Sequence, residues 1–436
     1  MPSEDLWGVT TEAMAEVTSA SAWVERMVSV EAALSRALSE VGVAPAGTVP
    51  LGASLDVASI VARSRVAGTP VIPLVADLVA EFGPSVHVGA TSQDIIDVGL
   101  ALTGRTAVGA LAPDAERCAA ALAELAGTHR TSVVAGRTLL QQGAPTSFGL
   151  VAAGWLTGIV DAWAGLLIAA RAVPAQLGGP VGTLSALGTK GPEVLTRFAR
   201  DLGLPEPTLA WHTNRQPIAR VAAALAILAG SVHKVAADLA LHAQTEIGEV
   251  AERSEPGRGT SSAMPHKRNP VASVRAMAAA RQVAPIAGGI LAGMADHPFQ
   301  RAVGAWQAEV PALNSMYGFV AVALESLADA LRGLHVDGDR MRANLDPRGG
   351  WSAEAASVAL TPHLGREGAR TAVAAASDAA RTNGTALLAE LRAAMTADAV
   401  PADVLEAAGD PAALLGSSSV FIDRALAHYR ESALHP

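Results

Sequence analysis

The sequence predicts an all-α fold built around a central bundle of long helices, and three observations carry this prediction. Aromatic residues, which strands favour, make up only 3% of the chain. Ala and Leu, which favour helices, recur throughout. We also find no convincing strand-like alternation over more than four residues. With 436 residues, of which 50% are hydrophobic, the chain can bury a large core.

The expected helices follow in chain order. Val24–Val41 places apolar residues on one face between Glu and Arg residues, which is typical of an amphipathic helix. Shorter helices are expected over residues 55–65 and 73–81, and a polar segment opens another helix at Ser92 or Gln93. From Asp337 onward the pattern predicts several short helices. The long helical runs between these parts are expected over residues 106–129, 147–172, 194–202, 216–252, 271–294 and 306–334.

These elements suggest three domains. We expect an N-terminal helical domain over residues 1–93, a central helical bundle over 94–343 and a small C-terminal helical domain over 344–436. The central bundle contains a polar loop at residues 255–270. Its helices are apolar on most faces, and one bundle cannot bury every such face by itself. We therefore expect an obligate, symmetric oligomer.

Composition argues against several classes of partner. The chain carries 32 basic and 41 acidic side chains, a net charge of −9, and no basic run, so no nucleic-acid partner is expected. Cys118 is the only cysteine, which leaves no internal disulfide and no Cys-based metal cluster. Residues 149–170 are long enough to cross a bilayer, but Asp161 lies mid-span, so we favour a buried helix and expect no membrane partner. The first ten residues lack a secretory pattern, and a reducing cytoplasm is the simplest location.

The polar loop carries most of the chemistry. Residues 257–270 read GRGTSSAMPHKRNP, longer than the roughly two to eight residues that usually join bundle helices. Its glycines can turn backbone amides toward an anion. Lys267 and Asn269 offer a positive charge and an amide donor to a carboxylate. Ser261 or Ser262 becomes a plausible base only if a closed, dry site stabilises its alkoxide.

Three segments together resemble a known superfamily. Residues 260–270, TSSAMPHKRNP, resemble the signature loop G-S-S-x-M-P-x-K-x-N-P of the fumarase/aspartase superfamily, with Thr260 at the usual Gly position. Residues 87–94 (HVGATSQD) and 136–146 (GRTLLQQGAPT) resemble its first and second regions, in the same order and spacing. The resemblance covers nearly the whole chain. It implies a three-domain, all-α homotetramer with active sites shared among subunits. It also implies proton abstraction next to a carboxylate without a metal or other cofactor.

The second region resembles one branch in particular. Most members have Thr-His where this chain has Thr138-Leu139, so an imidazole associated with general-acid function is missing. The R-T-L-L-Q form resembles the bacterial 3-carboxy-cis,cis-muconate cycloisomerases, which act in aromatic catabolism. The substrate expected from this resemblance is a small polycarboxylate, specifically a tricarboxylate. Cycloisomerisation expels a carboxylate in its reverse direction, and a carboxylate is a weak base that needs little protonation. Four further stretches agree with this branch, at residues 176–184, 211–215, 300–309 and 341–345.

The resemblance also assigns residues to functions. It implies that Ser261 is the catalytic base and that Ser262 is its neighbour in the catalytic loop. It implies a substrate-binding set drawn from the three regions and from two of the branch-specific stretches: His87, Thr91, Ser92, Gln142, His212, Arg215, Lys267, Asn269, Trp306 and Gln307.

Structural interpretations remain open for several charged residues. His266 can simply brace the loop, and His212 beside Trp211 can be a satisfied buried imidazole. Arg137 can pair with a carboxylate between helices. On a helix, the i, i+3 spacing of Glu246, Glu249 and Glu252 would place them on one face. We interpret this face as a solvated or subunit-contact surface in preference to a metal site.

Two rival functions also remain. The same scaffold could support a β-eliminating lyase that acts on a succinyl-type substrate. A protein of another class, a catalytically silent binding protein, is the second rival. The intact Ser-Ser-x-Met-Pro-His-Lys-x-Asn-Pro core argues against silence.

Overall fold

A computed structural model describes residues 8–45, 49–260, 264, 266–395, 401 and 403–435. Long α-helices dominate this part of the chain and two small two-stranded sheets accompany them, which confirms the predicted all-α class. The chain forms two compact units, described separately below. Unit 1 comprises residues 1–115, 161–233 and 275–326, and unit 2 comprises residues 116–160, 234–274 and 327–436. The division into three domains remains a prediction.

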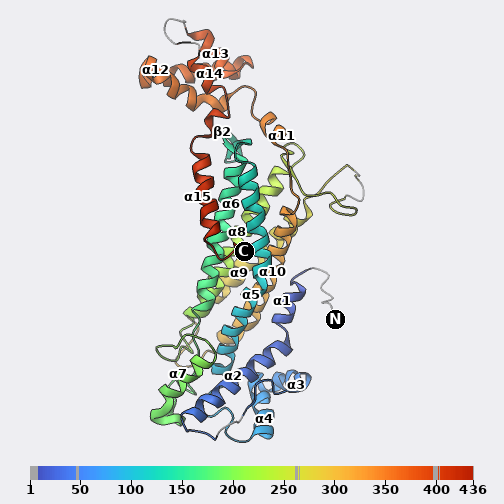
Figure 1. The fold of residues 1–436 in the computed structure, drawn as a ribbon, viewed down its shortest axis with the longest axis vertical. Helices are drawn as coiled ribbons and strands as arrows, with labels where there is room; N and C mark the ends of the chain where they lie inside the picture. Colours follow the sequence, from blue (N-terminus) through green and yellow to red (C-terminus); the bar gives the residue numbers. More distant parts are fainter. Residues whose placement is uncertain are drawn as a thin grey trace. The chain divides into compact units, whose positions relative to one another are not determined.

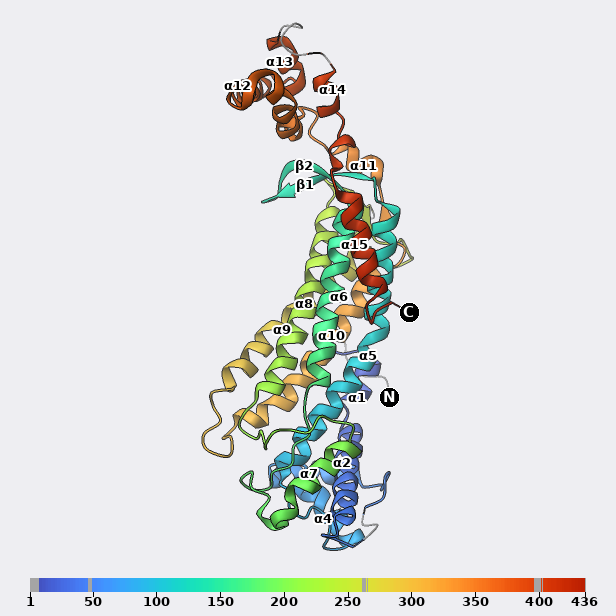
Figure 2. The ribbon, with the colours of Figure 1, turned by 60° about the vertical axis from the view of Figure 1, so that its left-hand side comes forward.

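Unit 1 begins with a group of short and medium helices. Side chains of Thr11, Ser19 and Asp56 accept hydrogen bonds from backbone N–H groups and so cap α1, α2 and α3. In Figure 1, α2, α3 and α4 lie together, and Figure 2 shows α7 alongside α2. These helices have the bounds α1 Glu12–Val17, α2 Ala20–Glu40, α3 Val57–Ala67, α4 Val71–Phe82 and α7 Gly191–Asp201.

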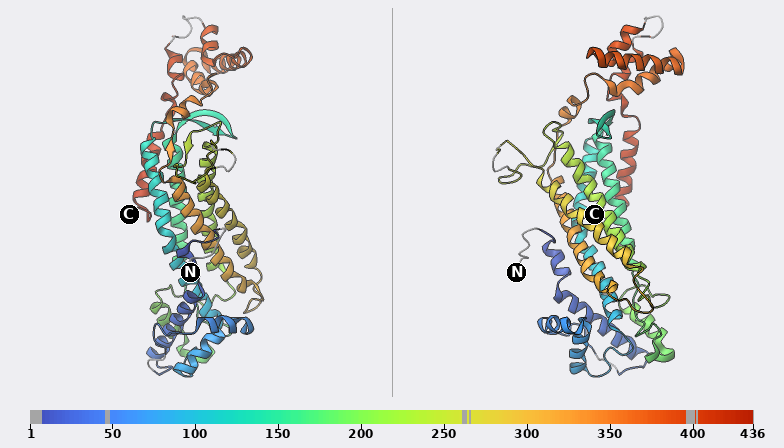
Figure 3. Two further views of the ribbon diagram at one scale, coloured as in Figure 1. Left: turned by 90° about the vertical axis from the view of Figure 1, so that its right-hand side faces the viewer. Right: turned by 180° about the vertical axis from the view of Figure 1, so that it is seen from behind.

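Segments of five long helices complete unit 1. Figure 3 shows the unit 1 parts of α9 and α10 running side by side. A 3₁₀ turn over Ser185–Lys190 precedes α7. The long helices have the bounds α5 Ser92–Thr128, α6 Phe148–Arg171, α8 Gln216–His242, α9 Val271–Gly293 and α10 Ala305–Leu331.

Unit 2 contains the remaining ends of these helices, two small sheets and the C-terminal helices. Strand β1 (Val133–Thr138) pairs with β2 (Gln141–Ser147), and β3 (Val250–Ala251) pairs with β4 (His335–Val336), both antiparallel. Figure 2 shows α12, α13 and α14 packed together, around a core that includes the buried Leu360, Leu391 and Leu405. The C-terminal helices have the bounds α11 Gly338–Ala343, α12 Ala353–Asn383, α13 Leu387–Ala394, α14 Val404–Ala408 and α15 Ser418–Arg430.

Two sequence predictions about local structure are wrong. The β1–β2 hairpin has strands of six and seven residues, although no strand of that length was expected. Its pattern is hidden because a bulge between Ala135 and Arg137 breaks the alternation. Helix α8 ends at His242 instead of continuing to residue 252, and Gly248 adopts a left-handed conformation with φ +60°. Glu246, Glu249 and Glu252 therefore do not share a helix face.

Four of the described helices are long and apolar enough to cross a membrane by length and composition alone: α5, α6, α8 and α10. Within each, between 50% and 67% of the most apolar window is buried inside the chain. Helices packed within a bundle show the same apolar composition.

Candidate functional site

A buried carboxylate organises the first turn of α5 in unit 1. Asp94 accepts hydrogen bonds from the backbone N–H groups of Thr91 (3.0 Å), Gly178 (3.0 Å) and Gly179 (2.9 Å). Its Oδ1 lies 2.6 Å from Nε2 of His212. Glycine is needed at position 178 because a Cβ there would lie 2.7 Å from Cε1 of His212. Asp94 thus fixes the first region against two other segments, and His212 is a buried imidazole with a partner.

One turn further along α5, Asp97 holds a buried arginine. The guanidinium of Arg215 donates to Asp97 through Nη1 (2.9 Å) and Nη2 (2.8 Å), and to Glu309 through Nε (3.0 Å) and Nη2 (2.5 Å). Nε1 of Trp306 also donates to Asp97 at 2.9 Å. Arg215 is only 1% exposed, and its guanidinium lies 4.7 Å from the ring centroid of Trp211. Two side-chain amides, from Gln93 and Gln176, complete the shell around Asp97.

The charges in this cluster affect one another. Burial alone would lower the pKa of Arg215, but the charges and hydrogen bonds of Asp97 and Glu309 raise it. Burial raises the pKa of the Glu309 carboxyl; Arg215 opposes this effect, and the nearby Asp97 charge adds to it. A single guanidinium therefore balances two buried carboxylates. This geometry favours a positioning function for Arg215 over direct contact with substrate.

His87 lies just before α5 in a strained backbone conformation. Its φ is +63°, a left-handed value that costs a residue other than glycine about 1 kcal/mol. Nδ1 of His87 lies 2.5 Å from Oε1 of Glu31 on α2. Burial tends to lower the pKa of His87, but Glu31 and the charge of Asp94 outweigh it, so the pKa is raised. Ser92, the first residue of α5, follows His87 by five positions in the sequence and is half-buried. Backbone N–H groups at a helix N-terminus favour anions.

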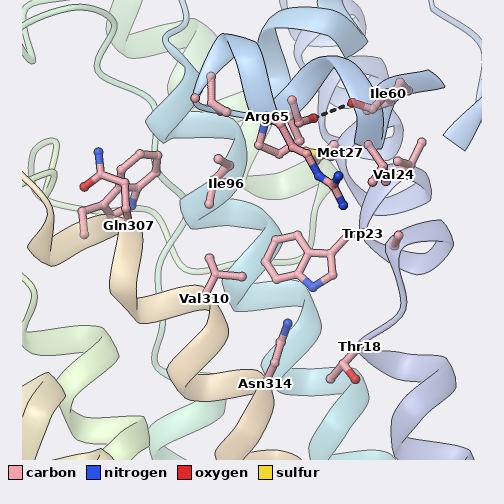
Figure 4. A pocket seen from close by; sticks show the side chains of 17 residues that line it. Thr18, Trp23, Val24, Met27, Ile60, Arg65, Ile96, Gln307, Val310 and Asn314 are labelled. Carbon is pink, nitrogen blue, oxygen red and sulfur yellow. Dashed lines mark hydrogen bonds between the residues drawn. The ribbon is translucent and has the colours of Figure 1, made fainter. Parts of the chain in front are cut away.

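Trp306 and Gln307, in the first turn of α10, line a cavity of about 490 Å³ (Figure 4). The Gln307 side chain caps its own helix, because its Oε1 accepts the N–H of Gly304 at 3.1 Å. The remaining wall comes mainly from apolar residues of α2 and α3, and Arg65 is the only charged side chain among the lining residues.

In unit 2, the second region uses Gln142 to hold a neighbouring segment. Its Nε2 donates to the backbone oxygen of Asn344 (2.7 Å), and its Oε1 accepts the N–H of Asp346 (3.0 Å). Both ends of the exposed amide are thus occupied within the chain. Leu139 and Leu140 form the tip of this hairpin with φ of +51° and +62°, and they are 96% and 74% exposed.

Arg137 pairs with a carboxylate, as one of its open interpretations predicted. Its Nη2 and Nη1 donate to Oε1 (2.6 Å) and Oε2 (3.0 Å) of Glu249, so the pair joins a strand to a loop instead of two helices. Nδ1 of His242 lies 2.6 Å from Oε2 of Glu249, and Asn344 donates to Oε1 at 2.9 Å. Burial would raise the pKa of Glu249, but these three partners lower it to about 2.

The base of the signature loop is firmly attached to unit 2. Arg258 donates to Asp329 at 2.6 Å and to Glu252 at 3.0 Å. Glu252 also accepts the N–H and Oγ–H of Ser273 at 2.8 and 2.9 Å, which anchors the first turn of α9. Asn269 closes the loop by donating its amide to the backbone oxygen of Gly259 (3.1 Å).

The rest of the signature loop's sequence includes the residues assigned to catalysis. Lys267 and His266 are exposed there. Ser261 and Ser262, the predicted base and its neighbour, lie outside the described residues. Their assignment therefore stays a prediction.

The structure brings together only part of the predicted set. His212, Arg215 and Trp306 meet through Asp94 and Asp97 in unit 1, whereas Gln142, Lys267 and Asn269 belong to unit 2. The sequence reasoning assigned no function to the carboxylates that organise these residues, namely Asp94, Asp97, Glu309, Glu31 and Glu249. Two of them, Asp94 and Glu309, lie inside the quoted stretches. A signal was present in the spacing of Asp94 and Asp97, which places both on one helix face. Within the described residues, no group of His, Cys, Asp and Glu side chains is arranged to hold a metal ion.

Known proteins resemble this chain over most of its length. The family model for lyases matches residues 2–284. The chain is 39% identical to a 3-carboxy-cis,cis-muconate cycloisomerase of Bradyrhizobium diazoefficiens, over 92% of this chain and 93% of that protein. It is 40% identical to a nitrosuccinate lyase of Streptomyces davaonensis, over 94% and 91%. The crystal structure of a 3-carboxy-cis,cis-muconate lactonizing enzyme from Pseudomonas putida superposes with a TM-score of 0.88 at 33% identity, covering 98% of this chain and 99% of that one.

Proposed function

Because the chain belongs to the lyase family of the fumarase/aspartase superfamily, we propose that it is a cycloisomerase of aromatic catabolism. It interconverts 3-carboxy-cis,cis-muconate and 4-carboxymuconolactone in the cytoplasm, within the β-ketoadipate pathway and without a cofactor. The similarity to enzymes of this activity supports the proposal at 39% identity in sequence and at a TM-score of 0.88 in structure.

The observation that favours the proposal over a lyase that expels an amine or hydroxide is the leucine at position 139. Superfamily members that expel an amine or hydroxide use an imidazole in this region, whereas this hairpin presents the exposed Leu139 and Leu140. Expulsion of a carboxylate needs no strong acid, because a carboxylate is already a weak base. From the lactone to the muconate, the reaction needs a base that removes the α proton as the carboxylate leaves, and from the muconate to the lactone the same group returns the proton to the α carbon. Both directions need several donors that stabilise the dianionic aci-carboxylate.

The proposal assigns these functions to the residues implied by the resemblance, each considered within its own unit. Ser261, with Ser262 beside it, removes the α proton, and Lys267 and Asn269 bind a carboxylate from the same loop. A second group of donors lies around the start of α5, at His87, Thr91 and Ser92. Gln142, His212, Arg215, Trp306 and Gln307 stay in the proposed substrate-binding set, and of these Arg215 acts by holding Asp97 and Glu309 in place.

The active enzyme in this proposal is a homotetramer with shared active sites. Leu139 is 96% exposed and Leu140 is 74% exposed, and both have a left-handed backbone. A turn of this type prefers Asn or Gly, so two strained, exposed leucines favour a tip that another subunit covers.

A β-eliminating lyase is the second candidate, and the 40% identical nitrosuccinate lyase favours it. Nitrite, like a carboxylate, is a weakly basic leaving group, so the absence of an imidazole suits both reactions. A steady-state assay with mass spectrometry separates them. Cycloisomerisation of 3-carboxy-cis,cis-muconate conserves the substrate mass, whereas elimination from a nitro- or aminosuccinate yields two products. Turnover of only the succinates would replace the first proposal with the second.

A further inference from the structure

We infer that Glu31 is a positioning residue that holds His87 as an imidazolium, so that the free Nε2–H of His87 binds a substrate carboxylate. Glu31 does not lie in any segment that resembles the superfamily motifs. The identity of the carboxylate rests on the proposed function, whereas the pairing itself does not.

The first support is the isolation of the Glu31 carboxylate. Its side chain is completely buried, in the middle of α2. Oε1 lies 2.5 Å from Nδ1 of His87, and Oε2 has no hydrogen-bond partner among the described residues. A buried carboxylate requires a compensating charge. The ring of His87 is the cation that the structure offers.

The second support is the electrostatic surroundings of the ring. Glu31 faces His87 from α2, and Asp94 acts on it from α5; both are acidic. Although burial opposes protonation, the two carboxylates together raise the pKa of His87. The alternative pairing, a neutral Glu31 that donates to a neutral imidazole, would instead require the effect of burial on the ring to outweigh the attraction of the neighbouring acidic groups.

The third support is the orientation of the ring. The backbone of His87 is held at φ +63°, and unusual values of this kind concentrate at functional sites. The side chain is 19% exposed, and Nδ1 is occupied by Glu31, so Nε2 is the nitrogen left for a ligand. The same segment leads into the N-terminus of α5 at Ser92, where backbone N–H groups also favour an anion. A cation fixed at this position complements a polycarboxylate.

The decisive variant is Glu31→Gln, which keeps the shape and an acceptor oxygen but removes the charge. Glu25→Gln is the matched control, because Glu25 lies on the same helix and is exposed. The titration of His87 is followed by NMR on protein labelled with ¹³C at histidine Cε1, and the His87→Gln variant identifies its signal. In the wild type the midpoint should lie above the ordinary value of about 6.5. In Glu31→Gln it should fall by about one pH unit or more, and in Glu25→Gln it should stay unchanged.

Binding and kinetics provide independent measurements. Calorimetry with propane-1,2,3-tricarboxylate should show about tenfold weaker binding to Glu31→Gln near pH 8, and a smaller loss near pH 5.5, where a larger share of the variant's His87 rings is protonated. With the proposed substrate, KM should rise while kcat changes by no more than about twofold. Glu31→Asp should partly restore affinity, because it restores the charge.

Three results would overturn the inference. The first is a wild-type His87 midpoint below the ordinary value, which can be measured even if a variant does not fold. The second is an unchanged midpoint in Glu31→Gln. The third is an equal loss of affinity at both pH values, which indicates only structural damage. If the NMR shift and the pH-dependent binding are found but the muconate is not converted, the proposed function fails and the positioning function of Glu31 stands.

Discussion

Arg215 meets Asp97 through two parallel hydrogen bonds, from Nη1 at 2.9 Å and from Nη2 at 2.8 Å, and neither side chain is exposed to solvent. Glu309 completes the arrangement from the other edge of the guanidinium. Removal of the arginine would leave these two buried carboxylates without its positive charge. The first prediction concerns the cost of this removal.

Arg215→Met should lower the free energy of unfolding by about 3–5 kcal/mol, because breaking a buried ion pair leaves uncompensated charge. Urea unfolding followed by tryptophan fluorescence measures the change. Arg366→Met, which removes an exposed arginine, should change stability by no more than about 0.5 kcal/mol. Unchanged stability in Arg215→Met combined with a raised KM would instead indicate direct contact with substrate.

The stability of unit 2 should depend on pH through Glu249. The folded pKa of about 2 lies below the ordinary value of 4.5, so the ionised carboxylate stabilises the fold above pH 4.5 and this contribution is lost as the pH falls toward 2. The full contribution is on the order of 3 kcal/mol. Unfolding measured between about pH 5.5 and pH 3 should show a smaller loss of stability in Glu249→Gln than in the wild type. The exposed Glu246→Gln serves as control and should retain the wild-type slope; the same slope in Glu249→Gln would contradict the prediction.

Ser261→Ala should abolish turnover while binding and fold remain nearly intact. A positioned base contributes roughly two to four powers of ten to the rate, whereas loss of one loop hydroxyl costs about 0.5 kcal/mol of stability or less. Lys267→Ala should lower affinity and turnover together, because it holds a carboxylate in both the ground state and the transition state. Ser262→Ala should be milder. Parallel measurement of kcat and of ligand binding distinguishes the three variants, and a dead Ser262→Ala beside an active Ser261→Ala would shift the assignment by one residue.

The protein should be a tetramer at micromolar concentration, with the leucine hairpin tip inside an interface. Light scattering should give four times the 44.1 kDa chain mass. Replacement of Leu139 and Leu140 by Asp should weaken assembly and activity together, since each aspartate would bring a charge into an apolar contact. A stable, active monomer of the unmodified chain would refute this prediction.

Turnover should survive exhaustive treatment with EDTA, because the proposed charge stabilisation comes entirely from protein groups. The assay compares treated enzyme with the same sample after addition of Mg²⁺, Mn²⁺ or Zn²⁺. Loss of activity on treatment and recovery with a divalent ion would reveal a metal site that the described residues do not show.

Local patterns in the sequence were sufficient for the long helices and for the signature loop. Apolar periodicity predicted α2 over Val24–Val41 against Ala20–Glu40 in the structure, and predicted α9 with a difference of one residue at its end. Short polar motifs such as TSSAMPHKRNP can be read directly, because their chemistry depends on residue types at fixed spacing. The same information could not place the end of α8, where the left-handed Gly248 and the partners of Glu249 decide the backbone.

Only the tertiary structure decided what the individual charges do. Arg215 in isolation suits a carboxylate substrate. In the fold, however, its guanidinium binds Asp97, which lies 118 positions earlier in the chain, and Glu309, which lies 94 positions later. Glu31 and His87 are separated by 56 residues, and no local pattern connects an apolar helix face with a loop histidine. The sequence thus determines which groups can ionise. The environment that sets their charge is assembled by contacts between distant segments, because burial and partners, rather than residue type, fix the energy of a charge inside a protein.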